Sequence, residues 1–285
     1  MPIPNETQRI LDKIADYERL GLFDRDVNDD PPTIPLRPGE VDYLGERFFS
    51  RVETKIANAL GKQHFEKMMT RGDVILKEIR GRENLAAVGE SGALITCNHF
   101  SVFDNYAVLK AVDPILKKSI LYKIIREGNY TSFPGLYGFL FRHCNTLPLS
   151  SNFSCIKELN VAIKTLFARG EKILIYPEQG MWPGYRKPRP LKLGSFRIAA
   201  REGVPVIPIF ITSEDTDKTG SDGLPVQAYT VHILPVIFPD EVLSVRQNTE
   251  RMCRENYRMW KETYESFYGI RLEYTTEGEV DPCSI

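Results

Sequence analysis

The residues Ala93-Leu94-Ile95-Thr96-Cys97-Asn98-His99-Phe100-Ser101-Val102-Phe103-Asp104 join a short apolar run to the start of a helical pattern. The run 93–97 has the length and composition of a buried strand, and apolar residues at helical spacing follow Asp104. His99 and Asp104 are therefore expected on a turn from a strand to a helix. Ligands bind at that end of the strands in open α/β sheets, so this stretch predicts both the fold class and the place of the site.

Short apolar runs and helical patterns alternate on both sides of this stretch. Such alternation predicts an α/β fold with a mostly parallel central sheet flanked by helices. The expected strands are residues 74–79, 93–97, 119–124, 146–149, 172–176, 204–211 and 228–236. The expected helices of this part are residues 104–112, 133–143, 154–168, 192–201 and 239–267.

Residues 1–72 lack this alternation and are expected to form a helical N-terminal extension, followed by one α/β domain over residues 73–285. Apolar spacing predicts one helix over residues 5–20 and a second over 41–70, broken near Gly61. A segment rich in Pro and Asp, residues 24–39, separates the two helices.

The composition is that of an ordinary globular protein, with 42% hydrophobic and 26% charged residues and a formal net charge of −1. This charge gives no global attraction to nucleic acid, so no nucleic-acid partner is expected. No signal peptide and no membrane-spanning segment are expected from the apolar runs.

The five cysteines have no metal-ligand spacing, which predicts reduced thiols in a cytoplasmic protein. They are Cys97, Cys144, Cys155, Cys253 and Cys283.

A histidine on such a turn can act as a general base near neutral pH, and a carboxylate five residues later can orient its ring. The alternative for His99 and Asp104 is a structural histidine beside a helix-capping aspartate. Ser101 raises a second alternative, a Ser/His hydrolase, but no G-x-S-x-G motif surrounds it, and capping the next helix is favoured. The four histidines are far apart in sequence, and no metal site is expected.

A second apolar run, Ile173–Tyr176, ends in Pro177-Glu178-Gln179-Gly180 and is followed by Arg186, Lys187 and Arg189. A turn with a carboxylate, a glycine and a basic loop suits a phosphate or pyrophosphate group. The alternative is a solvated surface loop.

In this order, the segments resemble the lysophospholipid and 1-acylglycerol-3-phosphate acyltransferase family. Asn98–Asp104 matches its N-H-x4-D motif, Tyr176-Pro177-Glu178 resembles its F-P-E-G-T-R-S motif, and Val204–Pro208 matches its V-P-[IV]-[IV]-P strand. The lead-in Ile79–Leu85, with Glu83-Asn84-Leu85 at its end, is also similar. The resemblance covers residues 74–236.

The resemblance implies an O-acyltransferase that moves a fatty acyl group from acyl-CoA or acyl carrier protein to a hydroxyl of a lysophospholipid-type acceptor. His99 would be the general base and Asp104 would orient it, with backbone N–H groups near the start of the Asp104 helix as candidates for an oxyanion site. No cofactor beyond the thioester co-substrate is implied. Asn98, Glu178 and Gly180 are expected to contact substrate, although Glu178 is equally compatible with bracing the loop.

Two departures from the family pattern concern the acceptor. The segment 145–150 lacks the arginine that holds the acceptor phosphate in glycerol-phosphate members, and Gly-Thr-Arg does not follow the glutamate. Arg186 or Lys187, with Lys123 or Arg142, would then hold the phosphate. The open alternatives are a non-phosphorylated lipid acceptor for the same dyad and a catalytically silent protein that binds a lipid or an acyl carrier.

Acyl-chain substrates lead us to expect peripheral association with the inner face of the membrane from the cytoplasm. An apolar stripe with Arg51 and Lys55 beside it is one candidate contact, although its spacing also fits packing on the core. The stripe consists of Phe48, Phe49, Val52, Ile56 and Leu60. Trp182 and Tyr185, beside the basic loop, are a second candidate.

Overall fold

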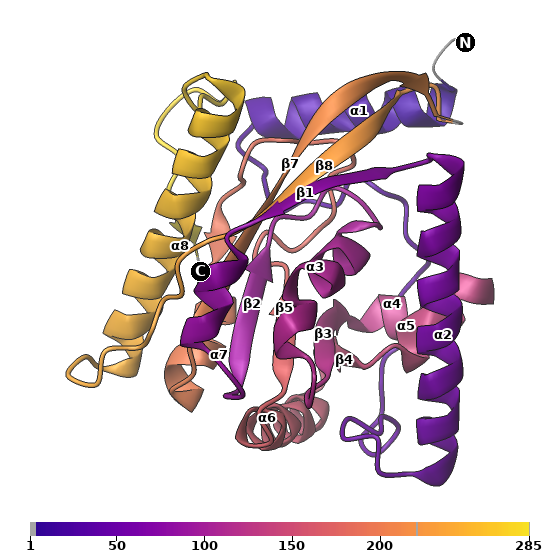
Figure 1. Ribbon diagram of the computed structural model, residues 1–285, viewed down its shortest axis with the longest axis vertical. Coiled ribbons are helices and arrows are strands. Elements are labelled where there is room, and N and C mark those ends of the chain that lie inside the picture. Colours follow the sequence, from indigo (N-terminus) through magenta and orange to yellow (C-terminus); the bar gives the residue numbers. More distant parts are fainter. Residues whose placement is uncertain (1–3, 221, 285) are drawn as a thin grey trace.

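The computed structural model describes residues 4–220 and 222–284 and shows helices on both faces of a central sheet (Figure 1). The seven-stranded sheet has the order β1-β8-β7-β2-β5-β3-β4. All neighbouring strands are parallel except β7 and β8, which form an antiparallel pair. The predicted fold class is confirmed. The strands are β1 (Ile75–Arg80), β2 (Ala93–Cys97), β3 (Leu121–Arg126), β4 (Thr146–Leu149), β5 (Lys172–Ile175), β7 (Val206–Thr219) and β8 (Pro225–Ile233).

The central strands are apolar on both sides because each side faces helices. Successive residues of β2 show this: Leu94 packs in the core on one face and Ile95 in the core on the other. The Leu94 face is covered by α6 (Phe153–Ala168), α7 (Leu193–Glu202) and α8 (Val245–Tyr268). The Ile95 face is covered by α3 (Asp104–Val112) and by part of α2 (Phe48–Arg71).

The remaining elements connect these layers. The 3₁₀ helices η1 (Arg82–Ala87) and η2 (Asp113–Ile115) flank β2 and α3 along the chain, and α4 (Glu127–Ser132) and α5 (Gly135–His143) lie between β3 and β4. The helix α1 (Asn5–Arg19) runs across the top of Figure 1, at the end of the sheet toward which β2 points.

The helix predicted over residues 41–70 is wrong in two respects. It begins at Phe48 rather than at Val41, because the Asp42 side chain accepts hydrogen bonds from the backbone amides of Glu46 and Arg47 and forms a turn there. It also continues through Gly61. A Cβ atom at this position would lie 3.6 Å from Leu140 Cδ2 of α5, which is an ordinary van der Waals contact, so the glycine marks no break in the helix. The division at residue 72 stays a prediction.

Residues 22–37, which we call the strap, connect α1 to the turn before α2 and cross the carboxyl ends of β5 and β3. The indole nitrogen of Trp182, after β5, donates to the carbonyl of Arg25 at 2.8 Å. The amide of Leu36 donates to Glu127, just after β3, at 2.6 Å. A small apolar cluster of Ile14, Phe23, Val27 and Trp182 anchors the strap beside α1.

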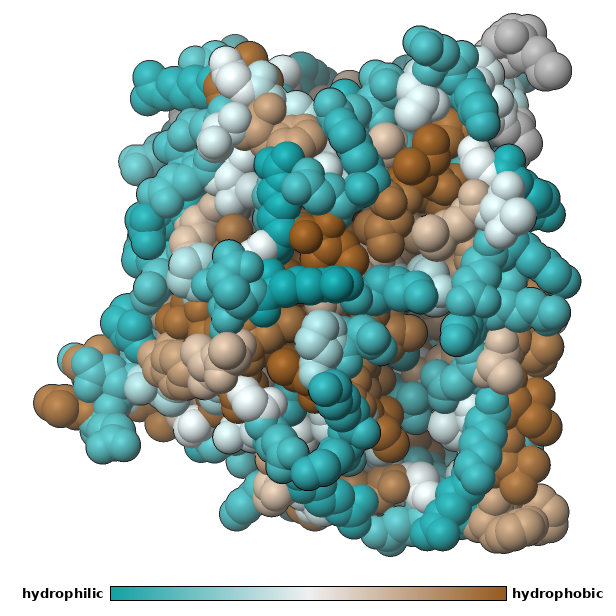
Figure 2. Space-filling view, in the orientation of Figure 1, coloured by the Kyte–Doolittle hydropathy of each residue, from teal (hydrophilic) through white to brown (hydrophobic). Residues whose placement is uncertain are grey.

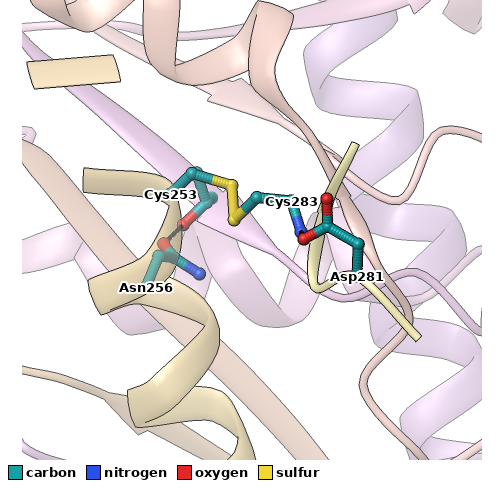
Figure 3. Close-up of a disulfide and its surroundings, with 5 residues drawn as sticks. Cys253, Asn256, Asp281 and Cys283 are labelled. Carbon is teal, nitrogen blue, oxygen red and sulfur yellow. Dashed lines mark hydrogen bonds between the residues drawn. A yellow bond between two sulfur atoms is a disulfide. The ribbon is translucent and has the colours of Figure 1, made fainter. Parts of the chain in front are cut away.

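The prediction of reduced cysteines is wrong for one pair. A disulfide joins Cys253 in α8 to Cys283 in β9 (Cys283–Ser284), near the end of the chain (Figure 3). Strand β9 pairs with β6 (Leu191–Lys192), directly after the loop that carries Arg189. No motif predicts this pair, because the two cysteines are 30 residues apart and have no recognisable spacing. Cys97, Cys144 and Cys155 are free.

Candidate active site

His99 and Asp104 face each other on the turn between β2 and α3. Nδ1 of His99 lies 3.0 Å from Oδ2 of Asp104. The same oxygen accepts hydrogen bonds from the backbone amides of Phe100 and Ser101, at 2.8 and 2.9 Å. Both amides are therefore engaged by Asp104 and are not available as an oxyanion site. The Asp104 side chain is fully buried, whereas that of His99 is 17% exposed.

Burial raises the pKa of the Asp104 carboxyl, and the hydrogen bonds from His99, Ser101 and Phe100 act in the opposite direction. A buried carboxylate with these donors stabilises a positive charge on the neighbouring imidazole. Because Nδ1 is held by Asp104, Nε2 is the nitrogen that can take up a proton from a substrate.

Tyr176 covers one face of the His99 ring. The two ring centroids are 3.8 Å apart and the planes differ by 15°, so the rings are stacked. Tyr176 directly follows β5, which is the parallel neighbour of β2 in the sheet. In the sequence, Tyr176 stood out only as part of a motif. Nothing in the spacing of the residues predicted that its ring would contact His99.

Glu178 is buried and its carboxylate is occupied by protein donors. Oε2 accepts from the backbone amide of His99 at 3.1 Å, and Oε1 accepts from the backbone amide of Arg189 at 2.8 Å. The Arg189 guanidinium forms an ion pair with Oε2 at 3.1 Å, and it lies over the Trp182 ring. In this structure Glu178 joins the turn after β2 to the loop after β5.

Two other residues expected to contact substrate also have neighbours within the protein. The Asn98 side chain forms a pair of hydrogen bonds with the backbone of Ile211, at 2.9 and 2.8 Å, and so joins β2 to β7. Gly180 lies against the strap, where a Cβ atom would approach Asp26 Oδ1 to 2.5 Å. Substrate contact by Asn98, Glu178 and Gly180 stays a prediction.

The cations expected to hold a phosphate are also bound to groups of the protein itself. Arg186 forms an ion pair with Asp215 and donates to Gln227, and Lys187 forms an ion pair with Glu18 at 2.6 Å.

Lys123 donates to the carbonyl of Cys144 at 3.0 Å, and burial lowers its pKa. Arg142 donates to the carbonyls of Tyr130 and Phe133, at 3.5 and 3.3 Å. The predicted cations thus each bind different groups of the protein.

Arg126 is a cation that the sequence did not single out. It is the last residue of β3, at the carboxyl edge of the sheet, and it forms ion pairs with Asp26 and Asp30 of the strap. The predicted strand 119–124 stops two residues before Arg126, so the only available signal was a cation close behind a predicted strand.

The expectation that Trp182 and Tyr185 reach a lipid surface is wrong. Trp182 is fully buried, and Tyr185 packs against it within the apolar cluster that anchors the strap. Among residues 4–220 and 222–284, no group of three or more His, Cys, Asp and Glu side chains is arranged to hold a metal ion.

Comparisons with known proteins agree with this arrangement of segments. The family model described as acyltransferase matches residues 77–212, which include the turns of both His99 and Glu178. A chloroplastic 1-acyl-sn-glycerol-3-phosphate acyltransferase of Brassica napus, BAT2, is 31% identical over 155 residues. That match covers 52% of this chain and 40% of the relative's length.

The fold is similar to the crystal structure of PlsC from Thermotoga maritima, a 1-acyl-sn-glycerophosphate acyltransferase, with a TM-score of 0.50 and 16% identity. The superposition covers 94% of this chain and 97% of that protein. Over residues 77–212, the chain is therefore similar to the acyltransferase family.

Proposed function

We propose that the protein transfers a fatty acyl group from a thioester, acyl-CoA or acyl carrier protein, to a hydroxyl of a lysophospholipid-type acceptor. The observation that supports this most is the contact of His99 Nδ1 with buried Asp104, which leaves Nε2 as the ring nitrogen not bound to Asp104 on a partly exposed side chain. The match of residues 77–212 to the acyltransferase family model supports the same class of reaction.

In this proposal His99 Nε2 takes the proton of the acceptor hydroxyl while its oxygen attacks the thioester carbonyl carbon. The tetrahedral intermediate then collapses, the C–S bond breaks, and the imidazolium returns the proton to the leaving thiol. Asp104 stabilises the imidazolium between the two steps. General-base assistance contributes about 10²- to 10⁴-fold, and positioning of the two substrates must supply much of the rest.

The acceptor class is inferred from the relatives, whose names specify 1-acylglycerol-3-phosphate, a phosphate-bearing lipid. We propose Arg126 as the cation that meets this phosphate, because it lies at the carboxyl edge of the sheet beside the strand that carries Tyr176. Asp26 and Asp30 of the strap would then be displaced by the phosphate. A non-phosphorylated acceptor is the second candidate, favoured by the engagement of Arg186 and Lys187 with protein groups.

A peripheral contact with the membrane is part of the proposal. Within the described ranges, no helix is both long and apolar enough to cross a bilayer. The stripe on α2 is open to solvent instead, with Phe48 and Phe49 73% and 77% exposed and Ile56 half-exposed. Figure 2 shows hydrophobic surface along the edge of the molecule that α2 forms in Figure 1. Such a helix can lie in a lipid interface.

The cytoplasmic location and the inner membrane face also stay proposals. They no longer draw support from reduced cysteines, since Cys253 and Cys283 are paired.

Release of free thiol from a long-chain acyl-CoA tests the function. Purified protein would be assayed alone, with lysophosphatidic acid, and with monoacylglycerol. Release that requires lysophosphatidic acid supports both the reaction and the phosphate-bearing acceptor, whereas release with monoacylglycerol alone supports the second candidate. Binding of acyl-CoA without release from any of these mixtures, or from acyl carrier protein as donor, supports a silent binding protein.

A further inference from the structure

The stack of Tyr176 on His99 connects two neighbouring strands of the sheet. Strands β2 and β5 are parallel, with Thr96 opposite Ile175, so the residues that follow each strand emerge side by side. His99 follows β2 and Tyr176 follows β5, and their rings meet face to face at 3.8 Å.

A single hydrogen bond does not fix the plane of an imidazole. The last torsion of a histidine side chain joins sp³ and sp² atoms and is broad, so the ring can rock about its contact with Asp104. A flat neighbour on one face restricts this rocking, and with it the direction in which Nε2 points. General-base catalysis depends on that direction, because the proton must be within hydrogen-bond reach.

Tyr176 is itself held firmly. Pro177 and Glu178 follow it and are buried, and Glu178 is anchored by Arg189. The carbonyl of Tyr176 accepts from the amide of Gln179 at 3.0 Å in a tight turn, in which Gln179 has the unusual φ of 69°. The ring that supports His99 thus belongs to a braced segment.

We propose that Tyr176 is the positioning residue of His99: its ring holds the imidazole plane so that Nε2 faces the acceptor hydroxyl, and its π face stabilises the imidazolium formed during transfer. This rests on the proposed function for its catalytic consequence. Stacked aromatic pairs and cations over aromatic faces are both favourable contacts.

The ring of Tyr176, rather than its hydroxyl, carries this role. The hydroxyl oxygen is buried and has no hydrogen-bond partner among residues 4–220 and 222–284. Phenylalanine at this position keeps the stacked face and removes only the unpaired oxygen, so it provides the matched control for a non-aromatic variant.

The test compares Tyr176→Leu with Tyr176→Phe. We expect Tyr176→Leu to lower kcat about tenfold to a hundredfold with little change in KM for the acyl thioester, because the base is misdirected. Tyr176→Phe should retain kcat within about threefold, since the ring remains. Equal losses in both variants, or full kcat in Tyr176→Leu, would overturn the proposal. If Tyr176→Leu does not fold, Tyr176→Met takes its place.

A spectroscopic measurement separates this proposal from the function. The Nδ1–H proton of His99, bound to Asp104, should give a downfield NMR signal, assigned by its absence from His99→Gln. We expect the signal in the wild type and in Tyr176→Phe, and its broadening or loss in Tyr176→Leu. An unchanged signal in Tyr176→Leu contradicts the positioning role, whatever the activity. If the NMR signals behave as expected but the protein transfers no acyl group, the proposed function is rejected and the positioning role of Tyr176 stands.

Discussion

Glu178 supports His99 through the backbone: its Oε2 atom accepts a hydrogen bond from the His99 amide at 3.1 Å. The same carboxylate forms a fully buried ion pair with Arg189. Two turns that carry the sequence motifs, one after β2 and one after β5, are thereby joined through a single side chain. The glutamate of the Pro-Glu-x-Gly segment therefore has a structural role in this protein.

Glu178→Gln should therefore destabilise the protein. Removing one partner of a buried ion pair leaves an uncompensated charge, here Arg189, and costs about 3–5 kcal/mol. We expect a decrease of that size in the free energy of unfolding measured by urea titration. The double variant Glu178→Gln/Arg189→Met should recover part of the loss, because it removes the stranded charge. A single variant as stable as the wild type would show that the ion pair contributes nothing.

The strap should compete with the acceptor for Arg126. Asp26→Asn with Asp30→Asn removes both carboxylates that pair with this guanidinium. We expect the KM for lysophosphatidic acid to fall about twofold to tenfold, as for the loss of weak, partly exposed ion pairs.

Asp29→Asn is the matched control, since Asp29 is also in the strap but pairs with Arg9 and Lys13 of α1. An unchanged KM in the double variant, or an equal decrease of KM in the control, would contradict the proposal that Arg126 binds the acceptor phosphate.

The exposed end of α2 should bind lipid. Phe48→Ser with Phe49→Ser removes two of the most exposed aromatic rings of the protein. Sedimentation with anionic liposomes should show binding weakened at least about tenfold, given the apolar area that two phenyl rings bury. Phe153→Ser on α6 is the control, because Phe153 is 69% exposed but lies outside the stripe. Equal effects of the two changes would argue against α2 as the contact.

The stability of the protein should decrease in acid partly through His232. Burial and the nearby Arg80 lower the pKa of His232 to about 4, while Glu78 acts in the opposite direction. The unfolded chain binds this proton near the ordinary pKa of about 6.5, so the free energy of unfolding falls between about pH 6.5 and pH 4. Below pH 4 this residue adds no further loss.

Denaturation at pH 7 and pH 4.5 tests this in the wild type and in His232→Gln. We expect the wild type to lose about 2–3 kcal/mol more than the variant over this interval. Parallel losses in the two proteins would show that His232 is protonated as readily in the folded state as in the unfolded chain.

The parts of the structure that the sequence predicted are local ones. The strand 93–97, its turn and the helix from Asp104 follow from apolar spacing within a dozen residues, and the contact of His99 with Asp104 needs only that turn. The catalytic roles of the two residues stay predictions.

The features that were missed depend on which strands are neighbours. Tyr176 reaches His99 because β5 lies beside β2, and Arg126 meets Asp26 because the strap crosses the end of β3. The pairing of Cys253 with Cys283 likewise depends on how the chain end returns to β6. The spacing of residues along the chain does not predict such contacts between distant segments.

Mass spectrometry of the lipid product gives the most direct test of acyl transfer through His99. Wild type, His99→Gln and Asp104→Asn would receive an isotope-labelled acyl-CoA and lysophosphatidic acid, after equal thermal stability has been established. We expect labelled diacyl product from the wild type, and rates lowered at least about a hundredfold in both variants. Product formation by His99→Gln at the wild-type rate would contradict the account, because the transfer would not need the base that the structure holds between Asp104 and Tyr176.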